Sequence, residues 1–527
     1  MAHDAYDLLD GTVSGFYEDV DNAIAASEVV KGQYRYTISP AYNSPNPVDS
    51  SAFTTVGLTQ NGPMVVDLEN SYITTEARVV LNSSTKLAED SVIFFGWKSS
   101  IEAIERYDIL VNNTPIYTQS FCGEESFVMD QILSDLVCHT TPFVYTTMED
   151  VRKGSPNVCG VYVKVGASFA AGQSIEFTVP IKIPLTNFLL LRNLKYLMSW
   201  MGKWELRLYF GISNMIVYPL STAESAAAFG TPAAAGTDRP KTTFYNVEDT
   251  RDYITEANTL GKGFMNKVKM TLNNVEMNAA HFQLRMDIME MLKQKYLAEK
   301  PLTFPVSSLQ IARFTGVVNN GTIAAGHTAD MSIVLCQAIN NCDTLFIIPF
   351  RNTFQHTCCE NPQVSNLQLH AGEYGTYPNQ PFNTYNKNAT NNIRYINQVM
   401  DALNVNASPI ISMNRAVANA FLPSLTLQDT TGTDITLDTH KYKFTGDESN
   451  FFIPFPFSTD DDFQGGLSSP AANINFKLTG TIHNTTGAQI VYSTPWVAAF
   501  LIDGVIMIRP DPASDAAKVI WSDRTVC

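Results

Sequence analysis

The chain has 527 residues, only 16% of them charged, and a formal net charge of −16. Globular chains usually carry about 25% charged residues, so much of this surface must be uncharged, which favours extensive contact with copies of the chain or with partners. The acidic balance argues against a sequence-independent nucleic-acid binder, which needs clustered Lys and Arg, and 11% aromatic residues exclude a disordered chain.

The first segment of the chain, residues 1–30, is acidic and weakly helical. We expect it to form an N-terminal arm that docks on a neighbour or stays mobile. Asp4, Asp7 and Asp10 stand where a secretory signal would carry basic residues, so we expect synthesis in a reducing compartment. The eight cysteines form no C-x-x-C pair and are then expected to be free thiols rather than a disulfide framework.

Strand patterns dominate from residue 72 onward. Segments 72–81, 91–97, 161–165 and 175–179 are short runs of β-branched and aromatic residues bounded by turn-forming residues. Regular helices do not alternate with them as they would in a parallel α/β sheet. The sequence therefore predicts an all-β dominated fold of the sandwich or barrel type.

Helical spacing of apolar residues occurs in only a few places. Segment 276–300 carries Leu284, Ile288 and Leu292 on one face and stops at Pro301, which predicts an amphipathic helix. The other predicted helices are shorter and cover residues 124–137 and 391–403.

The two halves of the chain repeat one order of elements. A hairpin, a short helix, a proline-containing strand and an alternating strand follow one another in each half, and corresponding elements are separated by close to half of the chain length. The corresponding segments are the hairpins 109–117 and 367–377, the proline-containing strands 178–184 and 451–456, and the alternating strands 204–210 and 473–478. We infer two β-domains of one plan in tandem.

The repeat suggests how the chain is divided. Residues 222–236 are rich in Ala, Gly and Ser and are typical of a flexible loop or linker. The predicted parts are the arm 1–30, a first domain 31–250, a second domain 251–510 and a C-terminal tail 511–527.

One group of residues has the composition of a metal site. It comprises His356, Cys358 and Cys359, with His370, Cys336 and Cys342 nearby in the sequence. Adjacent cysteines cannot easily ligate one tetrahedral zinc ion, and the usual paired spacings are missing. We therefore expect buried or half-buried thiols and no metal.

Carboxylates that could support other chemistry lack the required patterns. Asp460, Asp461 and Asp462 lack the alternating spacing of a calcium loop, which favours a solvated acidic turn. Glu176 and Glu205 could imitate a glycosidase pair, but nothing in the sequence brings them together. We assign no catalytic, cofactor-binding or metal-binding residue.

The longest apolar stretch, residues 496–508, is interrupted by Asp503 and Gly504. It falls short of the roughly 20 apolar residues that span a bilayer, so we expect no transmembrane segment. A buried hairpin or a bulged strand fits this pattern better.

Several collinear segments between residues 175 and 510 resemble the double jelly-roll major capsid proteins of eukaryotic double-stranded DNA viruses, especially those of polinton-like viruses and virophages. The matching positions are 183–185, Phe188, Gly202 and 205–208 in the first half, and 300–305, 361–362, 365–369, 377–378, 380–382, 466–470 and 500–508 in the second.

This resemblance implies two tandem eight-stranded jelly rolls in a structural subunit that is not an enzyme and needs no cofactor. It further implies a homotrimer that forms pseudo-hexameric capsomers of an icosahedral shell in the virion. The implied partners are neighbouring capsomers, a penton protein and minor capsid or cement proteins, with no sequence-specific contact to nucleic acid.

A different class of protein, a carbohydrate-binding or carbohydrate-cleaving β-protein such as a fibre, spike or lectin-like module, is the alternative. Such a site needs exposed aromatic residues beside paired carboxylates or amides, and the five Trp residues are scattered along the sequence. A cupin-like metal enzyme would need a His-x-His pattern, which is absent. The capsid interpretation is therefore preferred.

Overall fold

The structure is a computed structural model, and it describes part of the chain. The described residues are 2–26, 34–38, 53–59, 61–82, 92–97, 100–120, 159–164, 174–211, 216–220, 268–297, 302–314, 317–318, 321–335, 339, 341–349, 362–371, 375–384, 393–402, 427–428, 434–435, 452–457, 476–484, 489–491, 496–510 and 517–522. The predicted helix 124–137, the linker 222–236, Cys336, the triplet at 356, 358 and 359, and Asp460 to Asp462 lie outside them.

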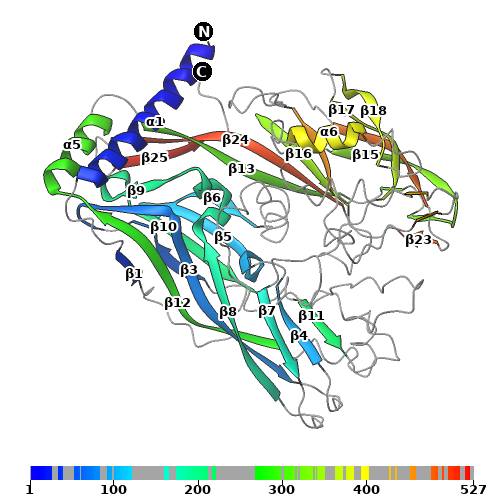
Figure 1. Ribbon diagram of the computed structural model, residues 1–527, viewed down its shortest axis with the longest axis horizontal. Helices are drawn as coiled ribbons and strands as arrows, with labels where there is room; N and C mark the ends of the chain where they lie inside the picture. The colour runs from blue at the N-terminus through cyan, green and yellow to red at the C-terminus, as the bar shows by residue number, and fades with distance from the viewer. Residues whose placement is uncertain are drawn as a thin grey trace.

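The first half forms a jelly roll from eight described strands (Figure 1). They are β1 (Tyr34–Ile38), β2 (Thr54–Gly57), β3 (Met64–Asn82), β5 (Ile104–Val111), β6 (Thr114–Gln119), β8 (Ser174–Pro184), β10 (Trp204–Phe210) and β12 (Val268–Gln283). One sheet has the order β1-β12-β3-β8, and the other has the order β2-β10-β5-β6. Numbered along the chain, the sheets therefore contain strands 1-8-3-6 and 2-7-4-5, which is the Greek-key arrangement of a jelly roll.

The second half repeats this arrangement strand for strand. Its eight strands are β13 (Leu302–Phe314), β15 (Thr328–Leu335), β16 (Cys342–Ile348), β17 (Val364–Ala371), β18 (Thr376–Phe382), β21 (Ile453–Pro456), β22 (Phe476–His483) and β24 (Trp496–Pro510). The sheet orders are β13-β24-β16-β21 and β15-β22-β17-β18, again 1-8-3-6 and 2-7-4-5. The predicted fold class, two tandem eight-stranded jelly rolls, is confirmed.

Further short elements extend the two jelly rolls. The additional strands are β4 (Val92–Trp97), β7 (Cys159–Lys164) and β11 (Ile216–Leu220) in one sheet, β9 (Tyr196–Met198) beside β3, β25 (Ala517–Ser522) beside β24, and the pairs β14 (Thr322–Ile323) with β23 (Ile490–Val491) and β19 (Leu427–Gln428) with β20 (Asp434–Ile435). The helices are α1 (Ala2–Ala26), α3 (Leu189–Arg192), α5 (Met286–Leu297) and α6 (Ile393–Ala402), with 3₁₀ turns η2 (Ser100–Ala103), η5 (Leu185–Asn187) and η6 (Ser199–Met201).

The predicted internal repeat corresponds to matching strands. The two hairpins are strands four and five of each jelly roll, the proline-containing segments contain strand six, and the alternating segments contain strand seven. In the first hairpin, Asn112 and Asn113 have φ values of 50° and 64°, the left-handed conformation that such a two-residue turn requires. In β10 every second residue is buried, from Trp204 to Phe210.

The hydrophobic core of the first jelly roll continues into the second half of the chain. Its buried cluster includes Leu302, Phe304 and Val306 of β13 and Ile506 and Ile508 of β24. The remaining parts of β13 and β24 belong to the second core, with Leu309 and Phe500 among its members. The paired strands β13 and β24 therefore contribute to both cores.

The predicted helix 276–300 is wrong in its first part. Residues up to Gln283 belong to β12, where Met277, Ala279 and His281 are buried and the strand pairs with β3. The helix α5 begins only at Met286. Helix 391–403 is confirmed as α6.

The hairpin expected at 496–508 is also wrong. β24 runs through Asp503 and Gly504 in unbroken register with β13, where these residues face Ser307 and Val306. The irregularity lies in the neighbouring strand β16, whose register with β24 shifts between Cys342 and Thr344. The Asp-Gly pair is accommodated beside a bulge and makes no turn.

The ends of the predicted parts are occupied by ordered elements. The segment predicted as an arm forms α1, the tail residues Ala517–Ser522 pair with β24, and β12, which follows residue 251, pairs with β3 of the first jelly roll. The division at 250 and 251 stays a prediction. Among the described helices, none combines the length and apolar character needed to cross a membrane.

Candidate assembly surfaces

The residues considered for metal binding are not brought together in the described part of the chain. His370 lies on β17, where its Nδ1 and Nε2 are each 3.1 Å from a threonine hydroxyl, those of Thr376 and Thr479. Cys342 is a buried free thiol, and its burial raises its pKa. No group of three or more His, Cys, Asp or Glu among the described residues could hold a metal ion.

The two glutamates considered as a glycosidase pair lie on different sheets. Glu176 of β8 forms an ion pair with Arg78 of β3, with 2.5 Å from Oε1 to Nε. Glu205 of β10 pairs with Lys203. Trp200, Trp204 and Trp496 are buried, so these rings offer no platform for a sugar.

The helix α1 packs into an aromatic pocket formed by both halves of the chain. Phe16, which is fully buried, contacts Tyr296 of α5 at a ring distance of 5.0 Å, Phe304 of β13 at 5.7 Å and Trp200 of η6 at 6.3 Å. Val13, Val20 and Ala23 are buried on the same side of the helix. Sequence reasoning missed this pocket because its walls come from positions about 100 residues apart.

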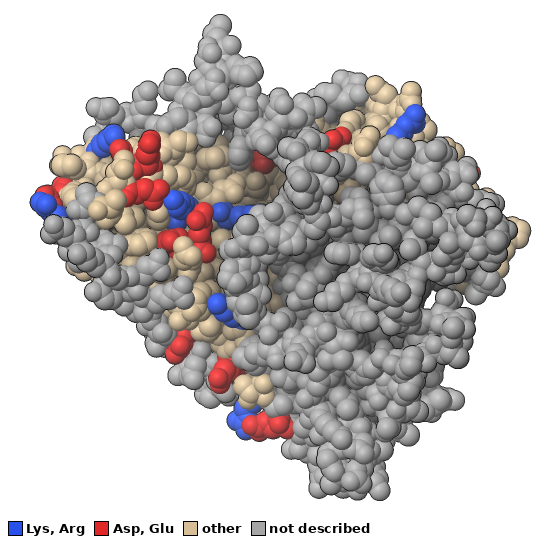
Figure 2. All heavy atoms as spheres, in the orientation of Figure 1, with Lys and Arg blue, Asp and Glu red and all other residues tan. Residues whose placement is uncertain are grey.

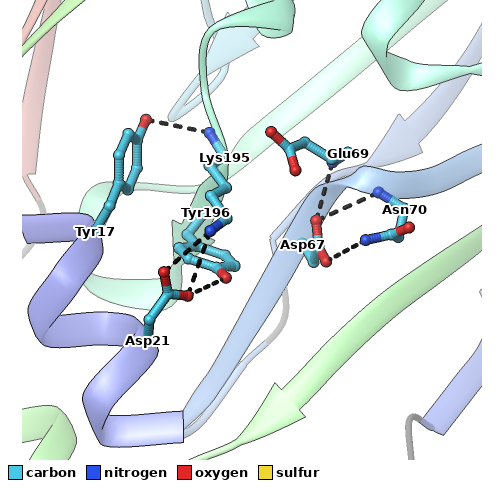
Figure 3. A network of polar contacts seen from close by, with 7 residues as sticks. All are labelled: Tyr17, Asp21, Asp67, Glu69, Asn70, Lys195 and Tyr196. Carbon is cyan, nitrogen blue, oxygen red and sulfur yellow. Dashed lines mark hydrogen bonds and ion pairs between the residues drawn. The ribbon is translucent and has the colours of Figure 1, made fainter. Parts of the chain in front are cut away.

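Polar contacts attach the next turns of α1 to the segment before β9 (Figure 3). The Tyr17 hydroxyl donates to the Asn193 carbonyl at 3.0 Å and accepts the Lys195 amide at 3.2 Å. Burial raises the pKa of Tyr17 to about 12. Asp21 accepts the Tyr196 hydroxyl at 2.5 Å and the Lys195 ammonium at 3.1 Å.

A second carboxylate attaches α1 to α5. Asp19 accepts hydrogen bonds from Lys295 and Tyr296. Partial burial alone would raise the pKa of Asp19, but these two donors and the Lys295 charge outweigh it and lower the pKa. On the outer side of α5, Met286 and Met291 are 69% and 64% exposed, which leaves an apolar surface beside the ion pair.

An acidic turn lies next to this attachment (Figure 3). Asp67 accepts the backbone amides of Glu69 and Asn70 at 3.0 and 3.3 Å and the Asn70 side chain at 2.7 Å. Desolvation, followed by the neighbouring charge of Asp67, raises the pKa of Glu69. In the view of Figure 2, basic and acidic side chains intersperse over the α1 and α5 end and the first jelly roll.

The outer face of the sheet β2-β10-β5-β6 carries a stack of aromatic and guanidinium groups. Tyr209 lies 5.6 Å from Phe53 and 5.0 Å from the Arg106 guanidinium, and Arg207 lies 4.6 Å from the Phe53 ring. Arg106 also pairs with Asp108 at 2.9 Å. The Nε of Arg207 is buried and has no hydrogen-bond acceptor among the described residues.

The contact between the two jelly rolls uses the edge of each sheet. The Tyr117 hydroxyl of β6 accepts the Leu309 amide of β13 at 3.5 Å. β6 and β13 are both terminal strands in their sheets, so the contact covers backbone groups that an edge strand would otherwise expose. Covered edges and a continuous core favour a fixed relation between the jelly rolls.

Comparisons with known proteins give structural likenesses only. No family model and no curated protein matches the chain. The chain is similar in structure to a chain of the Sputnik virophage determined by cryo-EM, with a TM-score of 0.49, 10% identity, and coverage of 94% of this chain and 90% of that one. It is also similar to the mavirus major capsid protein, with a TM-score of 0.44, 12% identity and coverage of 94% and 90%. The Faustovirus major capsid protein follows with a TM-score of 0.35, 10% identity and coverage of 90% of each chain. The assignment of two jelly rolls rests on the strand orders given above.

The chemistry of these surfaces is that of protein contact. Aromatic stacks, half-buried ion pairs and covered strand edges are features of interfaces. The candidate site is therefore a set of assembly surfaces distributed over both jelly rolls.

Proposed function

We propose that this chain is the major capsid protein of an icosahedral double-stranded DNA virus, a structural subunit that trimerises into pseudo-hexameric capsomers. The observation that carries the proposal is the repeated strand order, since two jelly rolls of one plan share a hydrophobic core within one chain. Three such chains present six near-equivalent jelly rolls around one axis. The sequence resemblance to double jelly-roll capsid proteins supports the same function.

The composition supports a building block with many neighbours. A surface with few charges suits wide protein contacts, because burying unpaired charges in them is costly. The proposed partners are neighbouring capsomers, a penton protein and minor capsid or cement proteins in the virion. A net charge of −16 supports a shell without sequence-specific contact to its genome, since phosphates repel an acidic surface.

The oligomeric state of the purified chain tests this function. We expect sedimentation to give a trimer and negative-stain microscopy to show particles of pseudo-hexagonal outline. A chain that stays monomeric at high protein concentration and forms neither trimers nor sheets would overturn the proposal.

A further inference from the structure

The contact between the two jelly rolls has an unoccupied counterpart on the other side of the chain. Tyr117 lies opposite Ile109 in the pairing of strands five and four of the first jelly roll, and Tyr377 lies opposite Leu369 in the same pairing of the second. Ile109 and Leu369 are both fully buried. The two tyrosines therefore hold the same position on the same edge of their jelly rolls.

In the first jelly roll this edge is covered by the second. β6 contacts β13, the first strand of the second jelly roll, through the Tyr117 hydroxyl, and it also contacts β25. In the second jelly roll the matching strand β18 is terminal in its sheet, with Asn379 and Gln380 exposed. No described strand pairs with its outer side.

The complementary half of the contact is open at the other end of the chain. β1, the first strand of the first jelly roll, is terminal in its sheet and pairs only with β12 among the described strands. Figure 1 shows β1 and β18 on opposite sides of the molecule. A chain with complementary edges on opposite sides joins head to tail with its copies and closes into a ring when the rotation permits.

The charges next to these two edges are of opposite sign. β18 has no charged residue, but Asp401 lies near its Tyr377 on α6 and has no ion-pair partner among the described residues. The only charged residue of β1 is Arg35. Beside Tyr377, the Gln398 Oε1 is buried without a hydrogen-bond donor in the described part of the chain.

We propose that β18, with the adjoining end of α6, docks on the β1 edge of a second copy and so repeats between chains the contact that β6 makes with β13 within one chain. This rests on the proposed function, because six near-equivalent jelly rolls in a trimer require the contact within the chain to be matched by one between chains. The occupant is a second copy of this chain.

Photo-crosslinking tests the placement directly. A benzophenone amino acid at position 379 is introduced into isotopically labelled chain, which is mixed with unlabelled chain and irradiated. We expect crosslinks between labelled and unlabelled copies that map to residues 34–38. Trimers whose crosslinks map elsewhere would overturn this inference and leave the proposed function standing, whereas wild-type chains that do not trimerise would overturn the proposed function itself.

A charge substitution provides the second measurement. Asn379→Arg places a cation on the proposed interface, and Asn22→Arg places the same cation on the exposed side of α1. We expect Asn379→Arg to raise the trimer dissociation constant about tenfold or more, as an uncompensated charge does at an interface, and Asn22→Arg to leave it unchanged. Equal dissociation constants for the two variants, with unfolding midpoints like that of the wild type, would contradict the proposed contact.

Discussion

The ring of Phe16 in α1 meets the ring of Phe304 in β13 at a centroid distance of 5.7 Å and an interplanar angle of 80°. This edge-to-face contact joins the start of the chain to the first strand of the second jelly roll. Because Phe304 also belongs to the core of the first jelly roll, α1 closes a site to which both halves contribute. The helix is thus part of the folded body of the chain.

We expect Phe16→Ala to lower the free energy of unfolding by about 3–5 kcal/mol, since it empties a fully buried aromatic site. Chemical denaturation measures the change. Glu18→Ala, an exposed position on the same helix, is the control and should change stability by less than about 0.5 kcal/mol. Equal effects of the two substitutions would mean that α1 is not packed as described.

The attachment of α1 should weaken in acid. Hydrogen bonds and charges from Lys295 and Lys195, opposed by desolvation, hold the pKa values of Asp19 and Asp21 below the ordinary 3.8. A depressed folded pKa stabilises the protein above the unfolded pKa, and this contribution is lost as pH falls below 3.8 through the folded value.

The double variant Asp19→Asn, Asp21→Asn isolates this contribution. We expect it to be less stable than the wild type by about 1 kcal/mol at pH 7, with the difference shrinking as pH falls below 4. Denaturation curves over this pH range measure it. A difference that is constant with pH would show that the carboxylates do not act through their charge.

Asp503 should have the opposite pH dependence. Burial, followed by the charge of Asp343, raises the pKa of Asp503 to about 7, so the native chain keeps a proton that the unfolded chain has released. Stability should therefore fall as pH rises from about 4 through 7. We expect Asp503→Asn to be more stable than the wild type at pH 8 by about 1–4 kcal/mol and nearly equal to it at pH 4, as measured by urea unfolding at both values. A variant that is destabilised at pH 8 would contradict this.

Two glycines should respond to alanine with opposite signs. Gly202 has a φ of +105°, and a Cβ there would lie 2.9 Å from Val111 Cγ1, so Gly202→Ala should cost about 1–3 kcal/mol. Gly15 lies in α1, and a Cβ there would have no other atom within 4 Å, so Gly15→Ala should stabilise the chain by roughly 1 kcal/mol through helix propensity. Thermal unfolding of both variants checks the two signs together.

The fold was predictable because the repeated order depends on local patterns. Asn112 and Asn113 specify a tight turn, and the alternation from Trp204 to Phe210 specifies a strand with one buried face. These signals need no knowledge of distant contacts. Their recurrence at half of the chain length predicted two domains of one plan.

The wrong predictions arose where local patterns overlap. Leu284 ends the buried alternation of β12 and also fits the helical spacing of α5, so the helix was extended backwards into a strand. Asp503 and Gly504 have the composition of a turn, but pairing along the whole of β13 keeps them in a strand.

The assembly surfaces could not be predicted from local patterns at all. Phe16, Tyr296 and Phe304 meet only after both jelly rolls have formed, and Tyr117 reaches Leu309 across the contact between them. No spacing rule connects such distant positions. The one sign available in the sequence was the shortage of charge, which gives no location.

The sharing of β13 and β24 between two cores limits how this gene can recombine. A crossover after residue 300 would pair one relative's first jelly roll with another's residues at positions 302, 304, 306, 506 and 508, which line that jelly roll's core. Unless those five side chains match in volume, the hybrid has a cavity or a clash where the parents are close-packed. The halves resemble duplicated modules, but they must be inherited together.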